Sequence, residues 1–321
     1  MSNRGIILIF VLIVISFAVG IVLVINKNAT DKYESTMRIY FRNQAALYAF
    51  TAVKAVAKVI EDDDNSYDSV DDDWYSIPPL PIEGGYLSVK VEPLNAKIDI
   101  NKIIFNNTKD KNESKKVRNR YIAAVKSIME NIYENDNTTD IVNIPSFGVL
   151  IDWIDEDSKI NEDDGDEQGL FYENNDKTYT IKNSKLDTLY ELNYIKGFKP
   201  LYVKGKNYLT VKSKENKINI NFASKKVLQA FLPEISDYAD DIISYRQDNP
   251  FKDVSQIRNV GIDDETYIKI LKYISVKSSL FKLKILVLIN SISFNYESIV
   301  ERANGHTKIL NFIEEANEDY F

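Results

Sequence analysis

The 321-residue chain contains no cysteine and only one histidine, His306. Without cysteine, disulfides and thiolate chemistry are excluded. A single histidine removes most histidine-based catalysis and the commonest transition-metal sites. His306 follows Asn304-Gly305, a pair typical of a hairpin turn, so we predict a solvated turn residue. A hydrolase with paired carboxylates would need a cleft in which two of them face each other, and no sequence feature indicates one. We therefore expect no enzymatic activity.

An excess of basic residues is also missing. The sequence has 40 lysines and arginines against 48 aspartates and glutamates, a formal net charge of −8. Proteins that bind nucleic acids usually present a basic face to the phosphates. The composition therefore predicts that nucleic acid is not a partner.

Charged side chains are almost absent from the first 25 residues. Only Arg4 is charged, and Ile6 to Ile25 contain no ionisable group. Twenty helical residues at about 1.5 Å each match a hydrocarbon core of about 30 Å, which predicts a membrane span. A cleaved secretory signal would have a shorter apolar region. Arg4 favours a cytoplasmic N-terminus, so we predict a single-pass inner-membrane protein whose remaining chain is periplasmic.

The helical pattern continues beyond the predicted membrane span. Residues 36–60 contain neither glycine nor proline, and apolar residues recur on one helical face at Ile39, Ala46, Phe50, Val53, Ala57 and Ile60. We predict one long helix, with its first half in lipid and its second half packed on a soluble domain. A break within residues 27–35 is compatible with the sequence.

Strand patterns flank a long helical block. Glu61 to Asp73 is rich in carboxylates, which predicts a solvated linker. A strand is predicted at Tyr86–Val91 after the Gly84-Gly85 turn, and Lys97–Asn101 is also extended. Residues 103–274 read as helical, with segments at 115–133, 149–154, 186–195 and 221–273. Strands return at 280–289, 293–301 and 308–313 as an antiparallel meander.

One acidic segment is a candidate metal site. Its carboxylates surround the turn residue Gly165, and the candidate ligands are Asp152, Asp155, Asp157, Asp163, Asp166 and Glu167. Ca²⁺ prefers six to eight oxygen ligands, although the EF-hand spacing is absent here. The spacing alone leaves a calcium site and a solvated acidic loop equally open. Burial of Ile151, Trp153 and Ile154 beside the loop would favour the cation, because it would hold the carboxylates together.

A second segment resembles a helix-hairpin-helix unit of DNA-binding proteins. Ile218 to Ser224 lead into a helix, then Leu232-Pro233-Glu234-Ile235-Ser236 form the hairpin before another helix. In DNA-binding examples glycines at the hairpin let backbone N–H groups approach a phosphate, whereas Glu234 here would repel it. We interpret the unit as a structural module. The alternative is a membrane-anchored protein for DNA uptake or binding.

The order of the motifs resembles one protein family. The short leader before Ile6 and the long apolar helix precede Lys97-Ile98-Asp99-Ile100-Asn101, and further matching segments lie at 150–155, 165–167, 189–192 and 218–221. Together they resemble the general secretion pathway protein K family, the large minor pseudopilins of bacterial type II secretion systems.

This resemblance implies an α+β pilin fold in which a long helix packs on an antiparallel sheet that carries a large inserted α-helical domain with helix-hairpin-helix and SAM-like elements. The expected segments are a leader at 1–5, a membrane helix at 6–25, pilin parts at 26–102 and 276–321, and the helical domain at 103–275. The family also implies structural Ca²⁺ in the helical domain, which favours the Asp152–Glu167 segment.

The resemblance further implies processing and partners. Prepilin peptidase would cleave after Gly5 and methylate the new N-terminus at Ile6. The protein would join I-type and J-type minor pseudopilins, cap the pseudopilus tip and help to start its assembly for protein export. Most pilins carry glutamate as the fifth mature residue, but this chain has Phe10. A carboxylate without a partner is costly in lipid, so its absence suits a subunit with no neighbour above it.

Overall fold

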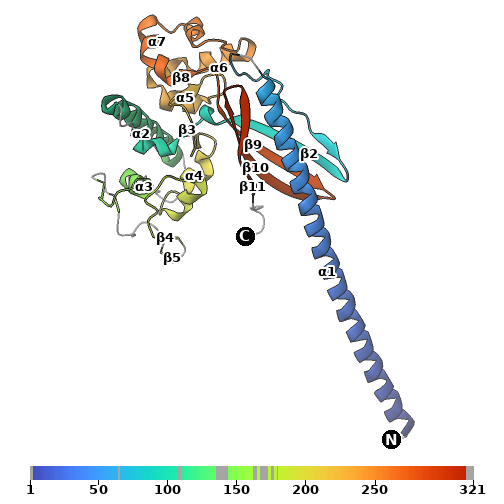
Figure 1. Ribbon diagram of the computed structural model, residues 1–321. Coiled ribbons are helices and arrows are strands. Elements are labelled where there is room, and N and C mark those ends of the chain that lie inside the picture. Colours follow the sequence, from blue (N-terminus) through green and yellow to red (C-terminus); the bar gives the residue numbers. More distant parts are fainter. Residues whose placement is uncertain are drawn as a thin grey trace.

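The computed structural model describes residues 3–63, 66–106, 110–134, 144–161, 165–166, 173–174, 177–178 and 180–315. A long N-terminal helix lies along a five-stranded antiparallel sheet, and a helical domain lies beside the sheet and extends past the end of this helix that is farther from the N-terminus (Figure 1). The helix and the sheet share one hydrophobic core, and the helical domain has its own. The predicted α+β class, with a pilin-like helix and sheet and an inserted helical domain, is confirmed.

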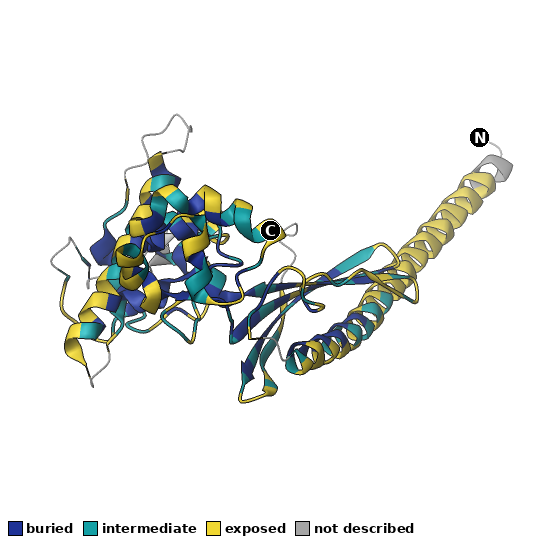
Figure 2. Ribbon diagram, turned by 90° about the horizontal axis from the view of Figure 1, so that it is seen from above, coloured by how far each residue is buried: buried dark blue, intermediate teal, exposed yellow. Residues whose placement is uncertain are grey.

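Helix α1 runs without interruption from Asn3 to Asp62, so the break considered within residues 27–35 does not occur. Its side chains from Ile7 to Ile25 are exposed, and burial begins where the helix meets the sheet (Figure 2). The predicted stripe is shifted, because Ile39 is 62% exposed. The residues that pack on the sheet are small or β-branched: Ala45, Ala49, Ala52, Val53, Val56, Ala57 and Ile60.

The sheet joins segments from both ends of the chain in the order β1-β2-β9-β10-β11. Its strands are β1 Leu80–Ile82, β2 Gly85–Pro93, β9 Leu280–Ile289, β10 Ile292–Ala303 and β11 His306–Glu315. The central pair places Val89 opposite Ile285, and alternate residues of both strands face α1. The β10–β11 turn uses Asn304 and Gly305 at positive φ, and the adjacent His306 side chain is 84% exposed, as predicted.

Apart from the 24-residue helix α2, the helical domain consists of short elements, most of which pack around one core. Its bounds are η1 Leu94–Ala96, β3 Ile98–Asp99, η2 Ile100–Ile104, α2 Lys111–Glu134, α3 Phe147–Ile154, β4 Glu173–Asn174, β5 Lys177–Thr178, η3 Leu189–Tyr194, α4 Lys199–Gly205, β6 Leu209–Thr210, β7 Ile218–Asn219, α5 Lys225–Phe231, η4 Pro233–Tyr238, α6 Ala239–Asp248, η5 Val254–Val260, α7 Asp264–Ile270, η6 Leu271–Tyr273 and β8 Ile274–Ser275. Strand β3 pairs with β6 in parallel, outside the main sheet. Ile98 and Ile100 are therefore part of the helical core rather than of the pilin core, with which we had grouped them.

The acidic segment after α1 is not the solvated linker that its charge predicts. Trp74 is fully buried, its indole N–H donates to Asp63 Oδ2 at 3.1 Å, and its ring packs edge-on against Phe281 of β9. Asp68 is also fully buried. The segment folds back because a buried aromatic anchor and a buried ion pair offset the repulsion among its carboxylates.

Candidate functional site

The first candidate site is the apolar end of α1. Within the described residues, α1 is the one helix long and apolar enough to cross a membrane. Phe10 is 66% exposed on this helix. Gly5 and Ile6 lie within the first turns of α1. Exposed apolar side chains on all sides of a helix suit a lipid environment.

The second candidate site is the acidic loop that follows α3. Asp152 is fully buried at the base of this loop. The backbone N–H of Asn161 donates to both of its carboxylate oxygens, at 3.1 and 3.2 Å, and the backbone N–H of Asp166 also donates to it. Gly165 lies so close that a Cβ at this position would collide with Asp152 Oδ2. The loop thus closes over one buried carboxylate, with glycine where no side chain fits.

The other predicted ligands occupy different positions. Asp155 is half-buried at the C-cap of α3, Asp166 is buried, and Asp157 is exposed, with one oxygen accepting the Lys159 backbone N–H at 2.8 Å. Asp163 and Glu167 lie outside the described residues. Trp153 and Ile154 are buried and Ile151 is half-buried, as expected for a loop anchored on the core.

Negative charge gathers around the buried Asp152 carboxylate in this loop. Burial raises the pKa of Asp152 above its ordinary value, and the negative charges of Asp157 and Asp166 raise it further. Among the residues that the structure describes, no lysine or arginine forms an ion pair with Asp152. Carboxylate and carbonyl oxygens are the ligands that Ca²⁺ prefers. Among the described residues, however, no three carboxylates of this loop bring their oxygens within 4.8 Å of one another.

A second acidic cluster, formed by Asp63, Asp68 and Asp72, was missed by the sequence analysis. Their carboxylate oxygens lie within 4.8 Å of one another. Arg302 from β10 pairs with two members of the cluster: its guanidinium contacts Asp68 at 2.6 and 2.8 Å and Asp63 at 3.3 Å. The Ser278 backbone N–H also donates to Asp68. The sequence gives no signal for this partner, which lies more than 230 residues from Asp68 along the chain.

Burial shifts the pKa values within this second cluster. It raises the pKa of Asp68, and the charge of Arg302 opposes that shift. Burial also raises the pKa of Asp72 to about 6, and the charges of Asp63 and Asp68 act in the same direction. The cluster connects the end of α1, the end of β10 and the segment between β8 and β9. It is therefore a junction between the sheet and the helical domain.

The helix-hairpin-helix segment uses its hairpin for internal packing. Arg120 of α2 donates to the Glu234 carboxylate at 2.5 and 3.0 Å and to the Phe231 carbonyl at 2.8 Å. The same guanidinium lies 3.9 Å from the centroid of the Tyr273 ring. A carboxylate where a phosphate would bind, held by an arginine from another helix, supports the structural interpretation.

Comparison with known proteins gives this architecture a context. One chain of "The Crystal Structure of the GspK-GspI-GspJ complex from enterotoxigenic Escherichia coli Type 2 Secretion System" matches with a TM-score of 0.68 and 18% identity. The match covers 88% of this chain and 99% of that chain, and it shows that the two share a fold. No curated protein matches the sequence.

Two family models match consecutive parts of the helical domain. The model for type II secretion system protein K, first domain, matches residues 96–211. This part of the chain is similar to type II secretion system protein K. A helix-hairpin-helix model matches residues 213–275, which confirms the motif that we identified from the hairpin residues. The matched model, the shared fold and the apolar N-terminal helix agree with a membrane-anchored minor pseudopilin.

Proposed function

We propose that this chain is a minor pseudopilin that caps the tip of a short periplasmic pseudopilus and helps to start its assembly, together with I-type and J-type minor pseudopilins. The observation that carries the proposal is the position of the helical domain, which lies beside the sheet and extends past the end of α1 that is farther from the N-terminus (Figure 1). A domain of this size at that end would obstruct the addition of another subunit above it. The structurally similar chain comes from a complex that contains GspI and GspJ.

The exposed face of α1 offers a surface for these partners. Tyr33, Tyr40 and Leu47 are spaced seven residues apart and are 57–66% exposed. Residues at this spacing form one stripe on a helix, so they can pack against a parallel pilin-type helix. Mixing full-length proteins in detergent tests this interaction. Leu47→Glu should reduce recovery of the three-protein complex, whereas Leu80→Glu on β1 should not. Equal recovery with both variants would contradict the role of the stripe.

Membrane insertion and processing precede assembly in this proposal. The N-terminus would be cytoplasmic and the rest periplasmic, with prepilin peptidase cutting after Gly5 and methylating Ile6. Mass analysis of the membrane form should find N-methylated Ile6 as the first residue. Gly5→Leu should block cleavage, and Gly20→Leu, the same change within the apolar helix, should leave it intact. A wild-type chain that retains Met1 in the presence of active peptidase would contradict the proposal.

Calcium would serve as a structural ion in the loop above Asp152. Asp152, Asp155, Asp157 and Asp166 are the described candidates for holding it, with Asp163 and Glu167 from the rest of the loop. The ion would supply the positive charge that compensates a buried carboxylate among like charges. Its role would be to fix this lobe of the helical domain.

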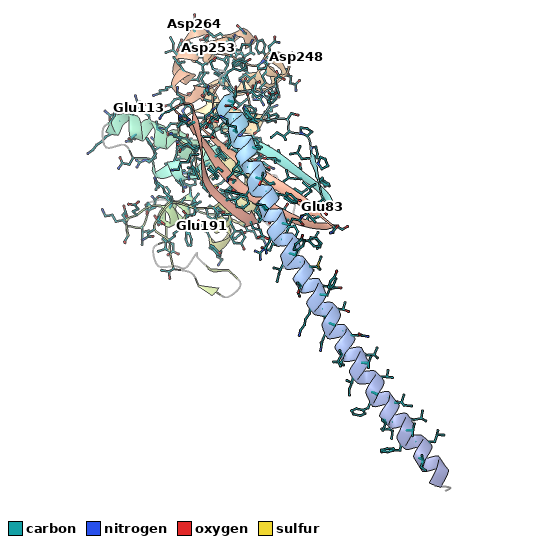
Figure 3. All side chains as sticks on the ribbon, turned by 45° about the vertical axis from the view of Figure 1, so that its right-hand side comes forward. Glu83, Glu113, Glu191, Asp248, Asp253 and Asp264 are labelled. Atoms are coloured by element: carbon teal, nitrogen blue, oxygen red, sulfur yellow. The ribbon has the colours of Figure 1, made fainter. Side chains whose placement is uncertain are left out.

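The competing DNA-binding function predicts salt-sensitive DNA retention by the full-length protein. Acidic residues, including Asp248, Asp253 and Asp264, lie at the end of the helical domain farthest from the N-terminus (Figure 3). Together with Glu234 they oppose phosphate binding, so we expect no retention at low salt. Retention that weakens as salt increases would favour DNA binding over the tip function.

A further inference from the structure

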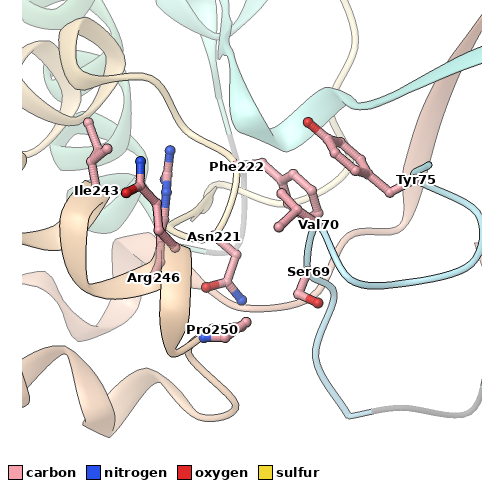
Figure 4. Close-up of a pocket in the computed structure, with 9 residues that line it drawn as sticks. Ser69, Val70, Tyr75, Asn221, Phe222, Ile243, Arg246 and Pro250 are labelled. Atoms are coloured by element: carbon pink, nitrogen blue, oxygen red, sulfur yellow. The ribbon is translucent and has the colours of Figure 1, made fainter.

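A small pocket lies between α6 and the segment that follows α1. Its volume is about 180 Å³. Ile243 and Arg246 line it from α6, Val70 and Tyr75 line it from the acidic segment, and Phe222 lies between them (Figure 4). Both sides of the pocket are fixed, because Asn221 at its base donates to the carbonyls of Asp68 and Phe251, each at 2.8 Å.

Arg246 provides the charge in this pocket. One of its NH groups donates to the carbonyls of Ile220 and Ala223, at 2.5 and 2.8 Å. A guanidinium has five N–H donors, so these two contacts leave donors available for a ligand. Burial lowers the pKa of Arg246 to about 10, and only the nearby Tyr75 acts in the opposite direction.

Two other arginines show what is missing around Arg246. Arg302 and Arg120 are also withdrawn from solvent, and each contacts a carboxylate, Asp68 and Glu234 respectively. Arg246 has no carboxylate within ion-pair distance among the residues that the structure describes. Because a half-buried cation without a counter-charge is costly, this pocket has the electrostatic character of a carboxylate site.

The size and rim of the pocket indicate the source of the carboxylate. Pockets for small-molecule ligands usually measure about 300–1,000 Å³, well above the volume found here. Val70 and Tyr75 at the rim are 39% and 37% exposed, which provides apolar surface beside the charge. A single side chain anchored by a charge pair and surrounded by apolar contacts is typical of a protein interface.

We infer that the Arg246 pocket receives the carboxylate of a glutamate or aspartate side chain from a neighbouring pseudopilin in the tip complex. The inference rests on the proposed function because it takes that neighbour to be the I-type or J-type subunit. Arg246 pairs with the incoming carboxylate, and Val70 and Tyr75 contact its stem.

A variant that carries a carboxylate at the rim of the pocket tests whether Arg246 can pair with one, without any partner protein. Val70→Glu places a carboxylate at the rim, where it can pair with Arg246. The matched control is Val203→Glu, the same change at an exposed position of α4. Val70→Glu should melt at a higher temperature than the control in the full-length protein in detergent. This difference should disappear when both changes are made in Arg246→Gln, a background that also corrects for the lost carbonyl contacts. Equal melting of the two variants with Arg246 present would overturn the inference.

Binding of the I-type and J-type pair tests the use of the pocket. Val70→Glu should weaken the affinity of the full-length protein by about tenfold, the loss expected for one charged hydrogen bond, while Val203→Glu binds like the wild type. Wild-type affinity of a stabilised Val70→Glu variant would overturn the role of the pocket in the complex. If the wild-type protein binds neither subunit, the proposed function itself fails, and the melting comparison still reports on the pocket.

Discussion

Two acidic clusters in this protein are balanced in different ways. The Asp63–Asp68–Asp72 cluster includes a guanidinium, because Arg302 contacts two of its members. The Asp152 loop has backbone N–H donors and further carboxylates around its buried oxygens. Aspartates thus contact an arginine at the junction, whereas in the helical domain they surround a buried carboxylate that no described lysine or arginine contacts. The number of carboxylates in an acidic segment does not tell whether an arginine from another element will pair with them. Only the fold shows that Arg302 reaches Asp68 and that no described lysine or arginine reaches Asp152.

Removing the Arg302 guanidinium from the junction should give the largest change in stability. Arg302→Met leaves Asp68 buried without its partner, so the free energy of unfolding of the full-length protein should fall by about 3–5 kcal/mol. Urea denaturation in detergent measures this loss. The double variant Arg302→Met with Asp68→Asn should recover part of the stability, because it removes the unpaired charge. A double variant that is no more stable than Arg302→Met would contradict the ion-pair explanation.

Adding Ca²⁺ should stabilise the protein through the loop around Asp152. Ca²⁺ at 100 times its dissociation constant should increase the free energy of unfolding by about 2.7 kcal/mol relative to chelator. Thermal melting of the full-length protein measures the shift. Asp152→Asn should abolish it, and so should Gly165→Ala, because a Cβ would collide with Asp152 Oδ2. Asp187→Asn, at a carboxylate that is 90% exposed, is the control and should retain the shift. A calcium shift that persists in Asp152→Asn would place the ion elsewhere.

The pH dependence of the junction should show that Arg302 does not balance all three carboxylates. The pKa of Asp72 in the folded protein is about 6, above its ordinary value of 3.8. Its contribution to stability is therefore fully present below about pH 3.8 and is lost as the pH rises through 6. Asp72→Asn should stabilise the protein above pH 6, by about 1 kcal/mol after allowance for solvent screening, and should have no effect near pH 3.5. Urea denaturation at pH 7.5 and 3.5 measures both values. A gain that is equal at the two pH values would contradict the raised pKa.

An exposed ion pair should contribute the least to stability. Arg42 on α1 contacts Glu314 on β11 at 2.8 Å, and its side chain is 61% exposed. Because water screens such a pair, Arg42→Gln should leave the urea midpoint close to that of the wild type. Repeating the measurement in 1 M salt should remove any small difference. A loss comparable to that of Arg302→Met would show that exposure does not determine the strength of these pairs.

The sequence predicted features that depend on local patterns. Apolar residues that recur every three, four or seven positions predicted α1. Alternation of apolar and polar residues predicted β2, β9, β10 and β11. The hairpin residues around Glu234 identified the helix-hairpin-helix unit. The carboxylates around Gly165 identified a loop in which Asp152 and Asp166 come together, although calcium binding remains a prediction. Each of these signals lies within a short stretch of sequence, where neighbouring residues share one element.

Features that depend on distant partners could not be predicted in the same way. The acidic segment after α1 appeared solvated because its own charges repel, and only the fold brings Arg302 and Phe281 to it. Ile39 belongs to the helical period but lies before the sheet begins, so it stays exposed. Ile98 and Ile100 read as a strand of the sheet, yet β3 pairs with β6 and joins the helical core. In each case the deciding partner is far away in the sequence.

The continuity of α1 has a mechanical consequence. Its 60 residues make a rod of about 90 Å, with no proline to bend it. Between the membrane end and the junction at Asp63 there is no joint that could absorb motion. Axial force applied to the N-terminal end is therefore transmitted as displacement of the distal domain over the same distance. The length of α1 therefore fixes the distance between the end of the helix at Asn3 and the junction at Asp63.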